Sequence, residues 1–174
     1  MSRTYEPITT YTLPSNGGPV TFSSIPQTYT DLRVVIKGGV ASGGFFIGFR
    51  IGTGSVDANQ NYSNVIVKEE TGALSTRSSN KTLGAFYEQS GPNNLQQSIV
   101  CDFLNYSNTT TYKTYLSRAG DATGYTSWLA GAWRNTGAID VISIALCGMG
   151  GTGFFNYANM YAGSTFTLYG IKAE

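Results

Sequence analysis

Glu69 and Glu70 are the only adjacent carboxylates in the sequence, so acid–base chemistry is sought there first. They follow a segment with strand character, where neighbouring side chains point to opposite faces. A glycosidase needs both carboxyl groups in one site, roughly 5 to 9.5 Å apart. We therefore interpret Glu69 and Glu70 as solvated charges. Asp102 and Asp140 stand in the polar phase of other strand-like segments, where surface or interface positions are expected.

Reaction chemistry is poorly represented in the rest of the chain. Histidine is absent from the 174 residues, which removes the commonest general base and zinc ligand. The glycine-rich stretches 38–44 and 148–153 lack the Gly-Lys-Ser/Thr ending of a phosphate-binding loop, and no helical pattern follows them. The sequence therefore predicts a protein that is not an enzyme and uses no cofactor.

Two features leave a choice of interpretation. The segment Asp57–Asn61 offers oxygen ligands but lacks the carboxylate density of a tight calcium site, so we predict no metal centre and keep a weak surface calcium site as the alternative. Cys101 and Cys147 form no Cys-x-x-Cys motif, and a disulfide between them stays open. Cys101 alternates with apolar neighbours, as a small buried residue would.

Aromatic residues in the second half of the chain also have two interpretations. They form a platform for sugars, or they are core and interface residues, which is the commoner role of aromatic side chains in a sandwich. The residues concerned are Tyr106, Tyr112, Tyr115, Trp128 and Trp133.

The surface is expected to carry unusually few charges. Charged residues make up 12% of the chain and the net charge is +1, whereas typical domains have roughly 25% charged residues. Such a chain has no basic field for nucleic acid. Its 12 tyrosines and 9 phenylalanines suggest a protein whose surface is bound to a protein partner. The first five residues lack the apolar core of a signal peptide and no run approaches ~18 apolar residues, so we expect cytoplasmic synthesis and no membrane insertion.

Residues 165–171 show the clearest strand pattern. Phe166 and Leu168 point one way, and Thr165, Thr167 and Tyr169 point the other. A terminal segment frays unless it is tied into a sheet, so we expect this strand to complete the fold.

Other short segments with strand character are separated by turn-forming residues, and no twelve-residue window has a helical apolar stripe. We therefore predict one all-β domain over residues 1–174, a sandwich or barrel of about eight to ten strands. Residues 71–82 are expected to be an exposed excursion and 148–160 a loop. The strand-like segments are 5–13, 20–25, 28–37, 45–51, 65–69, 83–87, 98–104, 112–118, 128–133, 139–146 and 165–171.

Three of these segments carry specific expectations. Pro7 places the first one at a sheet edge. Segments 98–104 and 112–118 are expected to pair as a hairpin. The apolar phase slips between Val141 and Ile142, which indicates either burial on both faces or a bulge.

The order and spacing of several blocks resemble a family of virion structural proteins of tailed phages. The C-terminal block, Gly-Ser-Thr-Phe-Thr-Leu-Tyr-Gly-Ile, is the most specific. The matching blocks are residues 5–8, 20–32, 105–109, 112–114, 131–136, 139–142 and 163–171.

This resemblance implies a jelly-roll-like sandwich of antiparallel strands and supplies no catalytic residues. It favours a capsid decoration (cement) protein on the exterior of the virion, a symmetric homotrimer that binds the major capsid protein or other virion proteins. The alternative is a tail or tail-fibre module that recognises a host surface glycan. The loop 148–162 has a bulkier tip than the family pattern, which suggests a contact specific to this protein. The interface residues we predict are Phe154, Phe155, Tyr157, Tyr161, Tyr5 and Tyr11.

Overall fold

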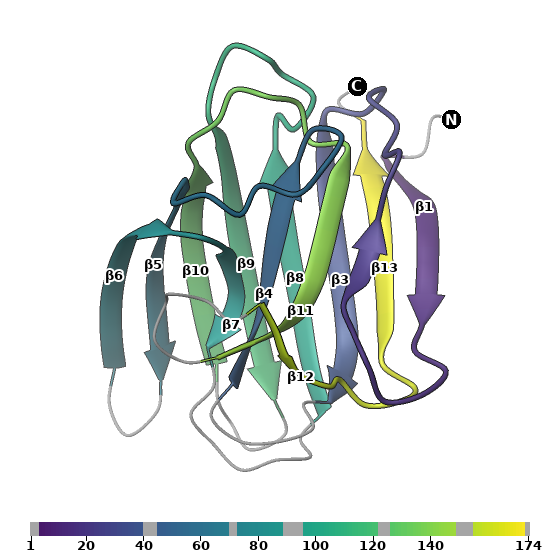
Figure 1. Ribbon diagram of the computed structural model, residues 1–174, viewed down its shortest axis with the longest axis vertical. Helices are drawn as coiled ribbons and strands as arrows, with labels where there is room; N and C mark the ends of the chain where they lie inside the picture. The colour runs from purple at the N-terminus through teal and green to yellow at the C-terminus, as the bar shows by residue number, and fades with distance from the viewer. Residues whose placement is uncertain are drawn as a thin grey trace.

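Two antiparallel sheets, one of eight and one of five strands, make up the part of the protein that the computed structural model describes (Figure 1), namely residues 4–39, 45–69, 73–88, 96–121, 126–148 and 155–172. These residues form no helix, so the predicted all-β sandwich is confirmed, and they contain no helix that could span a membrane. The strands are β1 (Tyr5–Thr12), β2 (Val20–Phe22), β3 (Asp31–Gly39), β4 (Phe45–Gly52), β5 (Tyr62–Glu69), β6 (Ala73–Lys81), β7 (Gly84–Glu88), β8 (Gln96–Leu104), β9 (Lys113–Asp121), β10 (Thr126–Trp133), β11 (Val141–Gly148), β12 (Phe155–Ala158) and β13 (Thr165–Ile171).

Eight of these strands are paired in a nested order. The first of the eight, β1, pairs with the last, β13. Each following pair lies inside the previous one along the chain: β2 with β11, β3 with β8, and β4 with β7. The pairs alternate between the two sheets, which gives the orders β1-β13-β3-β8 and β2-β11-β4-β7. This arrangement is the jelly-roll topology, in agreement with the expected fold.

Two insertions widen only one of the sheets. The β5–β6 hairpin lies between β4 and β7 in sequence, and β9–β10 lies between β8 and β11. Both join the edge at β8 and extend that sheet in the order β8-β9-β10-β5-β6, on the left of Figure 1. The larger sheet therefore has a jelly-roll half and an added half.

The inner faces of both sheets share one apolar core. Alternation puts Leu32, Val34 and Ile36 of β3 inward, and all three are fully buried. At the centre lies the Phe49 ring, 4.5 Å from Phe86 between ring centroids. The core is thus aromatic where the added strands meet the smaller sheet.

The C-terminal strand lies inside the sheet, between β1 and β3, and pairs with both (Figure 1). This confirms that the chain needs residues 165–171 to complete the larger sheet. β1 is the free edge next to it, as Pro7 predicts, and its register shifts between Pro7 and Thr9. The hairpin of β8 and β9 is also confirmed.

The described residues have 13 strands, more than the eight to ten predicted, because all eleven strand-like segments form strands and two segments expected to be loops contain one each. Ala73–Lys81 forms β6 at the second edge of the larger sheet, where it pairs only with β5. Phe155–Ala158 forms the short strand β12 beside β11. In β11 every residue from Val141 to Cys147 is buried, so the slip in its apolar phase reflects burial on both faces.

Candidate functional site

Three of the six predicted interface residues, Tyr5, Tyr11 and Tyr161, have side chains that the structure describes. Tyr5 and Tyr11 are exposed on the edge strand β1, near its opposite ends. Tyr161 lies in the segment between β12 and β13, and its amide donates to the carbonyl of Gly39. The predicted interface also includes residues of which the structure says little. Phe154 lies outside the described residues, as do the side chains of Phe155 and Tyr157 on β12.

The five aromatic residues of the second half divide between core and surface. Tyr106, Tyr115 and Trp133 are fully buried, and Tyr112 and Trp128 are exposed. Tyr112 directly precedes β9, whereas Trp128 pairs with Arg118 near the other end of that strand. The five therefore form no common platform, and Trp128 is left as the candidate for contact with a partner.

Trp128 lies within an apolar area on the outer face of the added strands. Its exposed fraction is 63%, and those of Leu116, Val65 and Val67 are 50%, 43% and 42%. We call these four side chains, together with Ala130, the Trp128 patch. Exposed apolar patches on soluble proteins typically mark binding surfaces.

The strand register explains why these side chains gather. One row across the sheet runs Val100, Arg118, Trp128, Val67 and Ser75 on β8, β9, β10, β5 and β6. The parallel row two residues along the strands runs Asp102, Leu116, Ala130, Val65 and Arg77.

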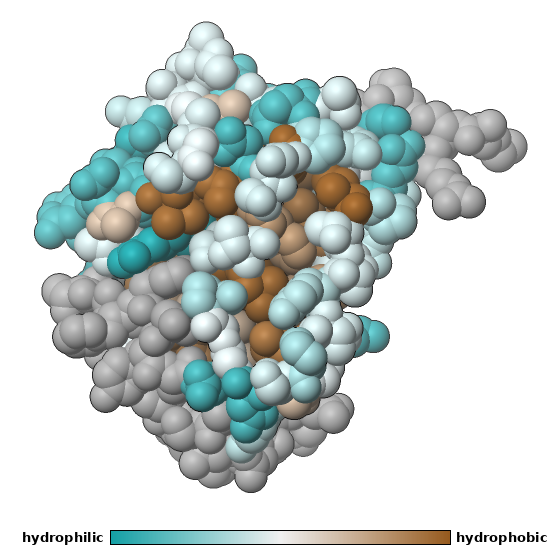
Figure 2. All heavy atoms as spheres, turned by 45° about the vertical axis from the view of Figure 1, so that its right-hand side comes forward, coloured by the Kyte–Doolittle hydropathy of each residue, from teal (hydrophilic) through white to brown (hydrophobic). Residues whose placement is uncertain are grey.

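The patch surrounds a groove of about 380 Å³. Its walls are mainly aliphatic and indole side chains, with Asp102 and Arg118 at the side nearer the jelly-roll half. On the side turned forward in Figure 2, apolar side chains appear in small groups separated by polar ones. Among the described residues, none of the large exposed apolar side chains belongs to the five-stranded sheet. The added half is therefore the most apolar outer surface that the structure describes.

A pair of charges borders the patch without adding net charge. The Arg33 guanidinium donates to both oxygens of Asp102, with N–O distances of 2.6 and 2.9 Å. The hydrogen bond that Arg33 donates to Asp102 raises the pKa of Arg33, although burial acts in the opposite direction. Arg33 also lies 5.0 Å from the centre of the Tyr5 ring. Asp102 thus has the interface or surface position that the sequence predicts, with a structural partner and no catalytic one.

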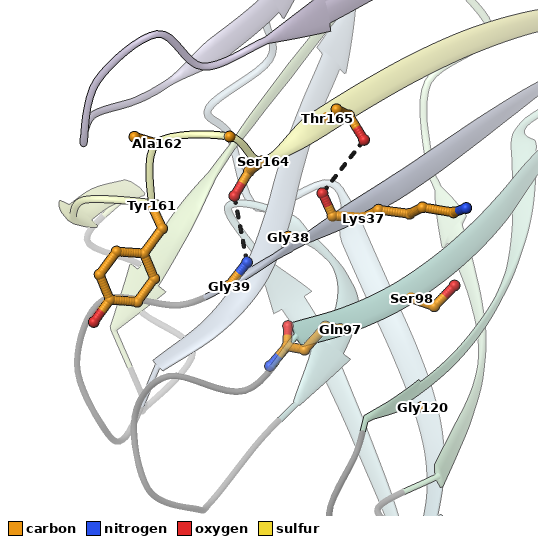
Figure 3. A pocket seen from close by; sticks show the side chains of 11 residues that line it. Lys37, Gly38, Gly39, Gln97, Ser98, Gly120, Tyr161, Ala162, Ser164 and Thr165 are labelled. Atoms are coloured by element: carbon orange, nitrogen blue, oxygen red, sulfur yellow. Dashed lines mark hydrogen bonds between the residues drawn. The ribbon is translucent and has the colours of Figure 1, made fainter.

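A second, larger hollow lies at the ends of β3, β8, β9 and β13 (Figure 3). It has a volume of about 740 Å³ and is lined by Gly38, Gly39 and Gly120 together with hydroxyl and amide groups. Figure 3 shows the Lys37 ammonium pointing away from Tyr161. Ser164, at its base, accepts a hydrogen bond from the Gly39 amide. Among the described residues that line it there is no carboxylate.

The Asp57 carboxylate binds hydrogen-bond donors of the protein itself. One oxygen accepts from the amide and side chain of Asn59, and the other from Asn61 and from the indole of buried Trp133 at 2.7 Å. Burial acts to raise the pKa of Asp57, but the hydrogen bonds from Asn61, Asn59 and Trp133 outweigh it and hold the pKa below its ordinary value. These donors compete with any cation, which weakens the calcium interpretation. No cluster of three metal-binding side chains occurs in the described part of the chain.

Replacing Asp57 by alanine is expected to lower the free energy of unfolding by about 2 to 3 kcal/mol at pH 7, because Trp133 loses a charged acceptor. Since the pKa of Asp57 is lowered on folding, its contribution is complete above the ordinary carboxyl pKa and disappears as the pH falls through the folded value. The difference between wild type and Asp57→Ala in urea unfolding should therefore shrink below about pH 4.

Asp140→Ala is the matched control, since the Asp140 carboxylate accepts from the exposed Gly54 amide and not from a buried indole. A pH-independent difference for Asp57→Ala would contradict the assigned role.

The remaining buried reactive groups also have structural surroundings. Cys101 and Cys147 form no disulfide, and both are buried. Burial raises the pKa of Cys101 well above its ordinary value, which keeps the thiol protonated. The Nζ of buried Lys113 donates to the carbonyls of Thr111 and Thr136, and burial lowers its pKa. These contacts tie the turn before β9 to the segment after β10.

Comparison with protein-family models and with curated proteins finds no match for this chain.

Proposed function

We propose that this chain is a structural protein of a tailed-phage virion, a decoration protein that binds the outside of the assembled head and stabilises it. The resemblance of the seven sequence blocks supports the phage context. The observation that supports a docking role is the Trp128 patch, an apolar area on the outer face of a sheet in a weakly charged chain.

In this proposal the protein is made in the host cytoplasm and added to the exterior of the particle as a symmetric homotrimer. Its partner is the major capsid protein or another virion protein. Trimers match the three-fold positions of a capsid, and many copies supply avidity even where each contact is modest. The exposed Tyr5 and Tyr11 on β1 stay candidates for the contact between copies. Light scattering of the purified protein tests the trimer, and a monomer at high micromolar concentration would count against it.

The proposal is tested by co-sedimentation with heads that lack the protein. Trp128→Ala is expected to weaken binding about 30-fold or more, since a central tryptophan is a typical hot spot. Tyr112→Ala is the matched control, because Tyr112 is a similarly exposed aromatic outside the patch. Absence of wild-type binding to heads would overturn the proposal. So would an image of the particle that places a few copies on the tail only.

The exposure of Trp128 also favours the second candidate, a tail or tail-fibre module that binds a host surface glycan. An exposed indole face stacks well on a sugar ring. A screen against host polysaccharides distinguishes the two functions. Trp128-dependent binding to one glycan, without binding to heads, would support the tail module.

A further inference from the structure

The two rows that carry the Trp128 patch have an excess of positive charge. Across β8, β9, β10, β5 and β6, together with Arg33 of β3, they contain three arginines and one carboxylate, Asp102. Arg33 and Asp102 neutralise one another through two hydrogen bonds. The excess therefore belongs to Arg118 and Arg77.

Arg118 and Arg77 have no ion-pair partner among the described residues. Arg118 lies on β9 next to Trp128, and Arg77 lies on the edge strand β6 next to Val65. Three strand spacings of about 4.8 Å separate β9 from β6, and the two arginines stand in rows two residues apart, so their Cα atoms lie roughly 16 Å apart on two sides of the patch. Arg118 lines the apolar groove, and Arg77 lies one strand beyond its Val65 wall.

We infer that the Trp128 patch docks on an acidic protein surface, an inference that rests on the proposed function. The partner inserts an apolar side chain into the groove, and its carboxylates pair with Arg118 and Arg77. A partner whose carboxylates flank an apolar residue at a similar spacing matches both the groove and the charges. Complementary charges at the rim of an interface fix its register and speed association.

A second copy of the chain fits this face poorly. In a two-fold contact the same patch meets itself, and these rows offer no unpaired carboxylate to meet Arg118 or Arg77. Like charges brought together in this way oppose association.

A glycan also fits less well than a protein. Sugar hydroxyls need several hydrogen-bonding groups, and the groove offers few. Asp102 is bound by Arg33, and the Ser117 hydroxyl is buried, at hydrogen-bond distance from the Phe86 carbonyl. Arg118 is the main polar group left at the groove.

The test measures binding of the purified protein to heads that lack it, by co-sedimentation from about 50 to about 500 mM NaCl. Arg118→Gln and Arg77→Gln are each expected to weaken binding about tenfold at low salt. The double variant should bind with much less dependence on salt than the wild type. Arg50→Gln is the charge-matched control on the five-stranded sheet, and Trp128→Ala removes the apolar contact.

The outcomes separate this inference from the proposed function. Wild-type binding that Trp128→Ala abolishes but that both arginine variants retain would overturn the acidic partner and leave the decoration role in place. A Trp128-dependent dimer in sedimentation equilibrium would show that the patch is a self-contact, and would also overturn it. If the wild type binds no heads at all, both fail together.

Discussion

Removal of residues 164–174 is expected to leave no soluble folded protein. β13 lies between β1 and β3, so its loss breaks the hydrogen bonds of two strand pairs and separates β1 from the sheet. It also removes Phe166 and Leu168, both fully buried. Loss of a buried phenylalanine or leucine side chain costs about 2 to 5 kcal/mol, and a whole domain is stable by about 5 to 15 kcal/mol. The exposed edge of β3 would then favour aggregation.

The measurement is the soluble yield of the truncated protein and its unfolding by circular dichroism. Two point variants in β13 test whether the loss of buried side chains causes the loss of stability. Phe166→Ala is expected to lower stability by about 3 to 5 kcal/mol, and Thr167→Ala, on the outer face, by less than about 1 kcal/mol. Soluble, cooperatively unfolding truncated protein would contradict the central position of β13.

The strands that the sequence predicts well have one buried face and one polar face. β3 and β13 alternate without interruption, so both their existence and their orientation follow from the two-residue period. Pro7 marks a true edge because it lacks an amide for a second neighbour. These features are local, so a single sequence contains them.

β6 could not be found in this way. Its residues Ser75–Asn80 are polar and mostly exposed, since β6 is an edge strand at the end of the added half. The hydrogen bonds to β5 decide that it is a strand, and strand propensity depends strongly on such pairing. β12 is only four residues long and is likewise formed by pairing, with β11.

The Trp128 patch was only partly predictable, for a related reason. Val65, Ile66 and Val67 form a continuous apolar run, in which Ile66 is buried and both valines are exposed. Such a run gives no phase from which the inner face can be read. Trp128 is visible as a candidate in the sequence, but its neighbours across the sheet come from segments that only the register brings together.

The proposed docking surface lies outside the strands of the jelly-roll plan. The nested pairs of the jelly roll supply most of the core, whereas every side chain of the Trp128 patch, together with Arg118 and Arg77, comes from β5, β6, β9 or β10. These strands are insertions into the eight-strand plan. A function grafted on a common fold is expected to reside in such additions.

The second large loss of stability is expected from a substitution in the aromatic core, where the added strands pack on the jelly roll. Phe49→Ala is expected to lower the free energy of unfolding by about 3 to 5 kcal/mol. The Phe49 ring is fully buried and lies 4.8 to 5.0 Å from the rings of Tyr115 and Phe103, between centroids. Urea unfolding followed by fluorescence measures the change.

Gly84 shows how closely the Phe49 ring is packed, because a methyl group at Gly84 would overlap that ring. Gly84→Ala is therefore expected to cost about 1 to 3 kcal/mol in the wild type and clearly less in Phe49→Ala, with a coupling energy of at least about 1 kcal/mol. Gly38→Ala is the control, since its methyl group would meet Ser164 instead. Its cost should add to that of Phe49→Ala within about 0.5 kcal/mol. Additive costs for Gly84→Ala would contradict this packing, because the cavity left by the ring would then not be the space that the new methyl group enters.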